Sequence, residues 1–452
     1  MRSASFRQLA NPVFQVVFVD LFSTLASYPL FFNPVKRKKG KIIRRKGFVP
    51  DNRGRRITVF LLPYIPPENE EKHAEGLNFE QKMLHYKVKN NGTLYEQTGI
   101  RINRMEQWQK SLENALTDAS ELAKRFDLSE ETVRRVSAVF PFRITRYYLS
   151  LIRAKGDPIY RQCVPDELEL LESGDLMDDP LGEEDLTPAP CVVHRYPDHC
   201  LLLVSNCCAC YCRFCTRKRK FRTPMCVDEA NVSRGIEYIA SNPAIHDVLV
   251  SGGDPFLLDT DRLDSILSRL RAIEHVDVIR IGTRTPCVLP ERINRRLVAM
   301  LRQYHPLYIN VHFNHPDEIT PQSAAALIRL ADAGIPLGSQ TVLLRGVNDD
   351  PEVIRLLMRK LLVVRVKPYY LFQSDLIYGT EHFRTPLSTG LDIMKKLRGW
   401  TSGMAVPHFA IDLPRGGGKV PLIPDYLEKV EGRAYTFRNF RGVPYCYPDI
   451  ED

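Results

Sequence analysis

The chain has 452 residues, of which 44% are hydrophobic and 26% are charged, as in a folded protein with a sizeable core. This composition excludes a disordered chain, and its 32 Pro and 25 Gly residues show no collagen-like period. The length exceeds one average domain, but an α/β barrel can hold more than about 200 residues as one domain. We therefore expect one large domain with attached segments.

The formal net charge of +9 is concentrated near the amino terminus. Residues 36–56 contain eleven Lys or Arg residues and one acid, Asp51, so the rest of the chain is close to neutral. A basic tail on a neutral body is weak evidence for nucleic-acid binding, and we expect none. The preceding apolar run, 12–32, contains Asp20, and an acid costs about 2.5–3.5 kcal/mol at the centre of a membrane span. We therefore expect no membrane association.

The distribution of charged and apolar residues divides the chain into five segments. We expect a basic, poorly structured extension over 1–95, a helical region over 96–164, an acidic linker or wrapping segment over 165–194, a barrel over 195–375 and a C-terminal segment over 376–452. In the helical region, apolar residues from Trp108 to Leu122 recur at helical spacing, and Ser129 is suited to cap the start of a helix.

Short apolar runs alternate with amphipathic stretches in the predicted barrel. The strand candidates are 200–205, 247–250, 278–282, 307–312, 340–344 and 364–371. The helix candidates between them are 234–240, 263–270, 323–333 and 352–362. This alternation predicts a parallel sheet, and six units suit a partial (β/α)6 barrel. In such a barrel the functional residues lie at the carboxyl ends of the strands.

Five of the eleven cysteines fall within residues 207–215. Clustered thiols without a secretory signal favour a metal or cluster site in a reducing compartment, for which the cytoplasm is the default. Cys208, Cys212 and Cys215 form a CxxxCxxC pattern that can bind three irons of a [4Fe–4S] cluster and leave the fourth iron for another ligand. A zinc site, in which Cys207 or Cys210 takes part, is the alternative.

Two glycine-containing motifs follow predicted strands. The stretch 251–254 (SGGD) comes after the second strand, where adjacent glycines permit close backbone approach to a ligand. The glycines at 416–418 precede Lys419, but the surrounding residues do not fit a phosphate-binding P-loop. A Lys on a glycine run suits a Schiff base with pyridoxal phosphate (PLP). A solvated surface Lys is the alternative.

Residues 98–426 resemble the lysine 2,3-aminomutases, which are radical S-adenosylmethionine (SAM) enzymes that also use PLP. The matching stretches include HRYPD (194–198), CTRKR (215–219), RIGTRTP (280–286), HFNHPDEIT (312–320) and PYYLFQSDL (368–376). The resemblance implies an α/β fold, namely a partial radical SAM barrel with an N-terminal helical region and a C-terminal PLP-binding extension. It also implies an isomerase that converts L-lysine to L-β-lysine.

The resemblance further implies roles for individual residues. The cluster ligands would be Cys208, Cys212 and Cys215. PLP would be bound by Lys419, Arg195 and Tyr196. SAM would be bound by Ser251, Gly252, Gly253, Asp254, His312 and Gln340. The substrate would be bound by Arg217 at its carboxylate and by Asp375 and Asp412 at its distant ammonium.

The two acids bear on the choice of substrate. Neighbouring carboxylates in a desolvated pocket repel unless a cation joins them, so Asp375 and Asp412 favour a substrate with a cationic side chain. Glutamate-specific relatives carry a lysine and an asparagine at this pair. Arginine would satisfy the same acids, and an arginine 2,3-aminomutase is therefore an alternative. A protein-lysine isomerase of the same family and a zinc-dependent nucleic-acid binder are two others.

Four positions depart from the family pattern: His199, Phe372, Arg415 and Asp350. His199 replaces an arginine near PLP, and Asp350 stands where relatives have a zinc-binding cysteine, so we expect no structural zinc. The expected partners are an amino acid substrate and a one-electron reductant of the flavodoxin or ferredoxin type. We also expect a cytoplasmic homo-oligomer.

Overall fold

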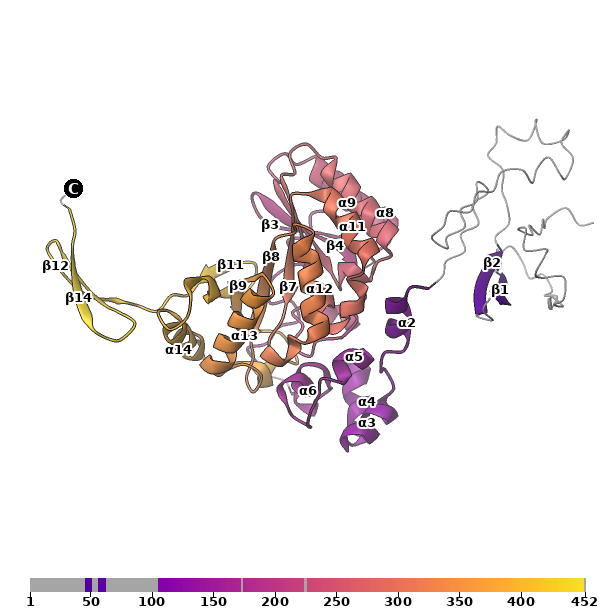
Figure 1. Cartoon of the computed structure of the whole chain (residues 1–452), viewed down its shortest axis with the longest axis horizontal. Helices are drawn as coiled ribbons and strands as arrows, with labels where there is room; N and C mark the ends of the chain where they lie inside the picture. Colours follow the sequence, from indigo (N-terminus) through magenta and orange to yellow (C-terminus); the bar gives the residue numbers. More distant parts are fainter. Residues whose placement is uncertain (1–44, 51–55, 62–104, 172–173, 223–225, 451–452) are drawn as a thin grey trace, which may run out of the picture. The chain divides into compact units, whose positions relative to one another are not determined.

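The computed structural model describes residues 45–50, 56–61, 105–171, 174–222 and 226–450. The chain divides into two compact units, 1–106 and 107–452. In the first unit, β1 (Arg45–Pro50) and β2 (Arg56–Leu61) pair as an antiparallel hairpin (Figure 1). The rest of the predicted N-terminal extension up to residue 95, including the apolar run, lies outside the described residues. Within the described ranges, no helix has the length and hydropathy needed to cross a membrane.

The second unit is built on a nine-stranded sheet with the order β11-β10-β9-β8-β7-β6-β5-β4-β3. Seven consecutive strands, β4 to β10, are parallel. At the two edges, β3 (Val192–Tyr196) and β11 (Gly418–Pro421) pair antiparallel to their neighbours. The strand order runs from β11 to β3 without closing, so the α/β fold is a partial barrel.

All six predicted strands are confirmed. They are β4 (His199–Ser205), β5 (Asp247–Gly252), β6 (Val278–Thr283), β7 (Leu307–His312), β8 (Leu337–Leu343) and β9 (Val366–Gln373). A seventh parallel strand, β10 (His408–Leu413), was not predicted from the sequence. It lies between Pro407 and Pro414 and buries only Phe409 and Ala410 fully. A run this short, next to two prolines, carries a weak strand signal.

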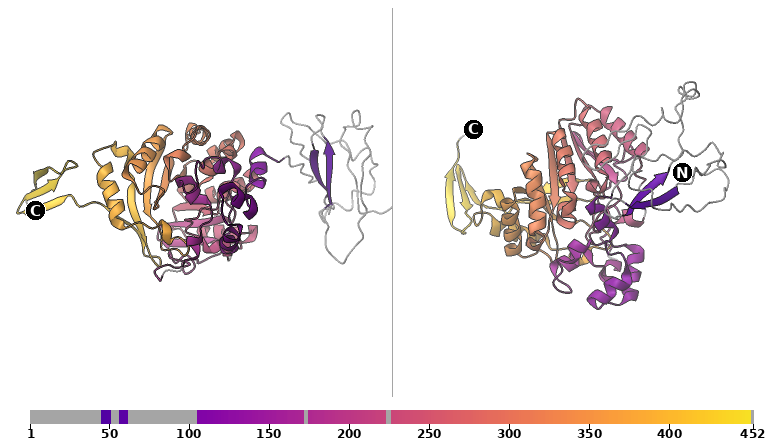
Figure 2. Two further views of the ribbon diagram at one scale, coloured as in Figure 1. Left: turned by 90° about the horizontal axis from the view of Figure 1, so that it is seen from below. Right: turned by 45° about the vertical axis from the view of Figure 1, so that its right-hand side comes forward.

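Helices connect the strands and pack along the sheet (Figures 1 and 2). They are α8 (Glu229–Ala240), α9 (Thr260–Arg271), α11 (Arg295–Leu301), α12 (Pro321–Asp332), α13 (Pro351–Val363) and α14 (Leu387–Leu397). Asp350, one of the four departures from the family pattern, caps α13, because its carboxylate accepts a hydrogen bond from the backbone N–H of Glu352 at 2.7 Å.

The N-terminal helical region packs on the barrel. It contains α2 (Gln107–Glu113), α3 (Ala119–Phe126), α4 (Glu130–Val139), α5 (Arg146–Leu149) and α6 (Pro158–Cys163). The predicted cap is confirmed, since Ser129 Oγ accepts a hydrogen bond from the N–H of Thr132 at 3.2 Å. Trp108, Leu122 and Tyr148 are buried in the same hydrophobic core as the strands, which fixes these helices beside the sheet.

The acidic segment after α6 contains a 3-10 turn, η2 (Glu167–Leu170), before it reaches β3. Met177 within it forms a parallel bridge with Ile377, so the segment lies beside the chain that follows β9. After β11 the chain forms a separate antiparallel sheet of β12 (Leu427–Glu431), β13 (Ala434–Arg438) and β14 (Pro444–Pro448).

Candidate active site

The cysteine loop follows β4 and is held by the N-terminal helical region. The N–H of Tyr211 donates to the carbonyl of Arg143 at 3.0 Å, and the N–H of Arg213 donates to the carbonyl of Gln162 at 3.0 Å. The Arg143 side chain donates in turn to the carbonyl of Cys208 at 3.2 Å. The helical region therefore fixes the loop that carries the predicted cluster ligands.

A buried ion-pair cluster supports the same loop. Arg213 lies between Cys212 and Cys215, Lys218 follows Cys215 by three residues, and both cations contact the Glu169 carboxylate at 2.6 Å. Arg213 also donates to the carbonyls of Phe140 and Pro141, both at 3.0 Å. Burial alone would raise the pKa of Glu169, but the two cations hold it below its usual value. This cluster was not predicted from the sequence, because nothing in the acidic segment indicates which acid is buried.

Replacing Glu169 by glutamine is expected to destabilise the protein by about 3–5 kcal/mol, because two buried cations lose their counter-ion. The measurement is urea unfolding followed by circular dichroism. Glu130→Gln is the matched control, because Glu130 pairs only with the exposed Arg134 on α4, and its loss should cost about 0.5 kcal/mol or less. Equal effects of the two substitutions would contradict the assigned role of Glu169.

A second acid of the same segment contacts Arg217, the predicted ligand of the substrate carboxylate. Glu183, whose side chain is 3% exposed, accepts hydrogen bonds from Arg217 Nε at 3.0 and 3.1 Å and from Arg217 Nη2 at 2.6 Å. Arg219, in α7 (Arg219–Arg222), contacts Glu183 and Asp179 at 3.1 and 2.9 Å. The acidic segment therefore neutralises the basic residues that follow the cysteines.

The two glycines of the SGGDP motif lie against the start of the cysteine loop. Gly252 has φ +127°, and a Cβ there would lie 2.4 Å from the carbonyl oxygen of Ser205. A Cβ on Gly253 would lie 2.4 Å from the carbonyl oxygen of Cys207. The N–H of Gly253 donates to the Ser205 carbonyl at 2.6 Å. The sequence predicted close approach to a ligand, and the structure shows that these glycines permit close approach to the cysteine loop.

Asp254 forms contacts that the sequence did not predict. Its buried carboxylate accepts hydrogen bonds from Thr283 Oγ1 at 2.8 and 2.9 Å and from the N–H groups of Arg284 and Thr285 at 2.8 and 3.0 Å. Burial raises the pKa of Asp254, and these hydrogen bonds oppose the rise. The carboxylate thus joins the loop after β5 to the loop after β6.

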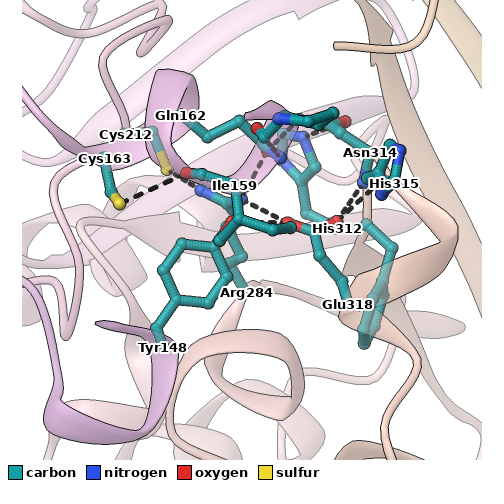
Figure 3. A network of polar contacts seen from close by, with 12 residues as sticks. Tyr148, Ile159, Gln162, Cys163, Cys212, Arg284, His312, Asn314, His315 and Glu318 are labelled. Atoms are coloured by element: carbon teal, nitrogen blue, oxygen red, sulfur yellow. Dashed lines mark hydrogen bonds and ion pairs between the residues drawn. The ribbon is translucent and has the colours of Figure 1, made fainter. Parts of the chain in front are cut away.

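Arg284 lies at the centre of a buried polar network beside the cysteine loop (Figure 3). Its Nη1 donates to Cys212 Sγ at 2.6 Å. Its Nη2 lies within hydrogen-bond distance of Tyr148 Oη at 2.9 Å, Gln162 Oε1 at 2.7 Å and Glu318 Oε1 at 2.9 Å. Burial raises the pKa of the Cys212 thiol to about 12, and the Arg284 cation is the strongest opposing influence.

His312, the last residue of β7, lies beside Gln340 in the middle of β8, because the strand register pairs the two residues. His312 Nε2 lies 3.0 Å from Asn314 Oδ1, and its ring centroid lies 5.5 Å from that of Phe214 in the cysteine loop. Burial lowers the pKa of His312 to about 4, and the Arg284 cation contributes. The imidazole is therefore expected to be neutral at pH 7 and to interact as a neutral hydrogen-bonding group, not as a cation.

The predicted PLP lysine lies opposite one of the predicted substrate acids. The antiparallel register of β10 and β11 pairs Asp412 with Lys419, and Asp412 Oδ1 lies 3.1 Å from Lys419 Nζ and 3.2 Å from Arg195 Nη1. The N–H of Lys419 donates to Tyr196 Oη at 2.9 Å. The amine also lies 5.4 Å from the centroid of the Phe372 ring. The structure thus brings three predicted PLP residues and one predicted substrate residue together.

Asp375 connects this pocket to the cysteine loop. Its carboxylate accepts a hydrogen bond from the hydroxyl of Thr216, the residue directly after Cys215. Burial raises the pKa of Asp375 to about 6; the Asp412 carboxylate adds to the rise and the Lys419 cation opposes it. This agrees with the expected repulsion between the two acids.

The remaining departures from the family pattern also have defined places. The His199 ring stacks on Tyr196, with 4.4 Å between the centroids, and its Nδ1 lies 2.6 Å from Asp198. Arg415 is exposed and has φ +55°, and its N–H donates to the carbonyl of Pro180 at 2.7 Å. Its backbone anchors the glycine loop to the acidic segment.

The residues present fit the expected cofactors. Cys208, Cys212 and Cys215 are free, partly exposed thiols on one loop. Beside them, Arg284 Nε is a buried donor with no acceptor among the described residues, which suits an acceptor outside the polypeptide. In the other pocket, Lys419 offers a primary amine with aromatic rings and a counter-ion around it. Among the described residues, no three His, Cys, Asp or Glu side chains are placed to hold a single metal ion.

Comparison with known proteins first defines the class. Residues 202–357 match the model of the Radical SAM superfamily, and this stretch contains the cysteine loop and strands β5 to β8. Residues 394–452 match the Lysine-2,3-aminomutase model. The fold and the loop are those of a radical SAM enzyme, a class that uses SAM and a [4Fe–4S] cluster.

Individual relatives define the family. The chain is 47% identical over 354 residues to the L-lysine 2,3-aminomutase of Fusobacterium nucleatum, covering 76% of this chain and 83% of that protein. It is 46% identical over 348 residues to that of Acetoanaerobium sticklandii, with coverage of 76% and 84%. It is 47% identical over 326 residues to the glutamate 2,3-aminomutase of Clostridioides difficile, with coverage of 71% and 76%. The chain belongs to the lysine 2,3-aminomutase family of isomerases, which confirms the predicted resemblance.

Proposed function

We propose that this protein is a PLP-dependent 2,3-aminomutase that moves the α-amino group of L-lysine to the β-carbon and yields L-β-lysine. The observation that carries the proposal is the pocket in which Lys419 lies 3.1 Å from Asp412, while the second acid, Asp375, is bound to the cysteine loop through Thr216. Two of the three relatives described above act on lysine.

The proposed cofactor sites follow from this placement. Cys208, Cys212 and Cys215 would hold the cluster, and Lys419 would hold PLP beside Arg195 and Tyr196. When bound, the cluster and SAM supply one-electron chemistry, and PLP carries the amino group and delocalises unpaired spin. The Arg195 guanidinium donates hydrogen bonds to Asp412 and to the carbonyl of Leu181. These two contacts fix the orientation of the guanidinium toward Lys419.

SAM would lie at the carboxyl ends of the strands. The residues proposed to line its site are Ser251, Gly252, Gly253, His312 and Gln340. His312 would contact SAM through its neutral imidazole. We assign Asp254 to the positioning of the loops after β5 and β6, because hydrogen bonds from Thr283, Arg284 and Thr285 already occupy its carboxylate.

The substrate would be held at both ends. Glu183 binds Arg217 through Nε and Nη2, and no described residue accepts a hydrogen bond from Nη1, so this edge of the guanidinium is available to the substrate carboxylate. At the other end, the contact between Lys419 and Asp412 shows that Asp412 accepts a primary ammonium. The side chain of lysine ends in the same group, which favours lysine over glutamate.

The KM for lysine is expected to rise about tenfold per pH unit as the pH falls below about 6. Burial raises the pKa of Asp375 to about 6, so its carboxylate becomes neutral below that pH and no longer attracts the substrate ammonium. The measurement is KM between pH 5 and 8. Asp375→Asn should raise KM at pH 8, as expected when a buried charge loses its partner at a cost of about 2–5 kcal/mol, and should remove the dependence below pH 6. An unchanged pH profile in this variant would contradict the assignment.

Radical SAM enzymes need a one-electron reductant, and the lysine 2,3-aminomutases act on a free amino acid. For this protein we propose a reductant of the flavodoxin or ferredoxin type, a cytoplasmic location and a homo-oligomeric assembly. All eleven cysteines are free, as in a reducing compartment. The exposed apolar residues Val430, Tyr445 and Tyr447 of the β12–β14 sheet support self-association.

A further inference from the structure

Arg284 makes a contact that neither the fold nor the proposed substrate chemistry requires. The residue is 8% exposed, and one of its terminal nitrogens, Nη1, donates to the sulfur of Cys212. The Glu318 carboxylate balances its charge through the other terminal nitrogen, Nη2. A buried arginine needs a counter-ion, and Glu318 supplies one. The hydrogen bond to the sulfur is therefore additional to charge neutralisation.

The neighbours of Arg284 hold its guanidinium toward the sulfur. Tyr148 in α5 and Gln162 in α6 contact Nη2 from the helical region, and Glu318 contacts it from the loop after β7. Glu318 is itself fixed by hydrogen bonds from the N–H groups of Asn314 and His315, at 2.6 and 2.9 Å (Figure 3). The guanidinium therefore has one orientation, in which Nη1 faces Cys212.

A second observation also indicates a group beyond the polypeptide. Arg284 Nε is buried, and no described residue accepts its hydrogen bond. Buried donors without a partner are rare in native proteins, and each indicates a missing acceptor or a functional constraint. An iron–sulfur cluster on Cys212 would bring sulfur atoms into this neighbourhood.

We propose that Arg284 is a positioning residue that orients the Cys212 thiolate and raises the reduction potential of the cluster. Hydrogen bonds to the sulfurs of an iron–sulfur cluster help to set its potential. Reduction adds negative charge, so a fixed cation that donates to a ligand sulfur stabilises the reduced cluster more than the oxidised one. The proposal rests on the assignment of Cys212 as a cluster ligand.

The test is an anaerobic redox titration of the reconstituted protein, followed by electron paramagnetic resonance, together with iron analysis. In the double variant Arg284→Gln/Glu318→Gln, a shorter, neutral amide replaces the cationic donor to the sulfur, and no buried charge is left unpaired. At a fixed potential, the ratio of reduced to oxidised cluster should fall at least tenfold, which corresponds to about 59 mV for one electron. Arg284→Lys, which keeps the charge, should give a smaller fall. Arg134→Gln, which removes an exposed arginine that pairs with Glu130 on α4, is the control and should match the wild type.

The outcomes separate this role from the proposed function. Iron-loaded double variants with a wild-type potential would overturn the role of Arg284 and leave the cluster assignment standing. If both Arg284 variants lose the cluster while the wild type binds it, Arg284 is needed for assembly of the cluster. That result would overturn its proposed role in setting the reduction potential. A wild-type protein that takes up no iron would overturn the cluster assignment and this role with it.

Discussion

Replacing Cys212 by alanine is expected to abolish activity and to prevent assembly of an intact cluster. The three thiolates of the loop would bind three of four irons, and Cys212 is the one that Arg284 contacts. Iron analysis of the reconstituted wild type should give about four irons per chain. The variant should show a clear loss of iron and no electron paramagnetic resonance signal of a reduced cluster.

Cys446→Ala is the matched control for this prediction, because Cys446 is an exposed thiol in β14. It should retain the iron content and the activity of the wild type. Cys207→Ala tests the zinc alternative, because a zinc site needs a fourth ligand and Cys207 could supply it. If the loop binds an iron–sulfur cluster instead, this variant should also retain its iron. A colourless wild-type protein that binds zinc and requires Cys207 would contradict the cluster assignment.

Replacing Lys419 by alanine is expected to remove bound PLP and to lower activity by several orders of magnitude, because the amine proposed to form the Schiff base is lost. Borohydride reduction of the wild type should fix PLP to a peptide that contains Lys419. The variant should lose this label and keep its iron, since the hydrogen bond from Thr216 of the cysteine loop to the pocket is accepted by Asp375 and does not involve Lys419.

Two further substitutions separate the chemistry of Lys419 from its charge. Lys419→Arg keeps a cation opposite Asp412 but cannot form a Schiff base, so it should be as inactive as the alanine variant. Lys429→Ala removes an exposed lysine that pairs only with Glu431 and should leave PLP binding intact. A borohydride-fixed label on any other lysine would overturn the assignment of Lys419.

The sequence predicted those parts of the fold and site that depend on local pattern. Alternating apolar runs indicated β4 to β9 because each strand is a short buried run between amphipathic helices. The cysteine spacing and the glycine run before Lys419 are also local features. Asp412 and Lys419 were both predicted, and a short antiparallel turn makes them neighbours.

The parts that were missed depend on contacts between residues far apart in the chain. Glu169 lies 44 residues before Arg213, and nothing around it distinguishes it from the other acids of 165–194. Arg284 belongs to a stretch that matched the family, but its contact with Cys212 spans 72 residues. The contact of Asp254 with SAM stays a prediction, whereas its hydrogen bonds to the loop after β6 were not predicted.

The most direct test of the proposed function is product analysis. Reduced protein should be incubated anaerobically with SAM, PLP and either L-lysine or L-arginine, and the β-amino acid formed should be identified and its kcat/KM measured. We predict L-β-lysine as the favoured product, with no turnover when SAM or PLP is left out. A kcat/KM at least tenfold higher for arginine, which is about 1.4 kcal/mol in transition-state binding, would contradict the assignment of lysine, and turnover without PLP would contradict the proposed mechanism.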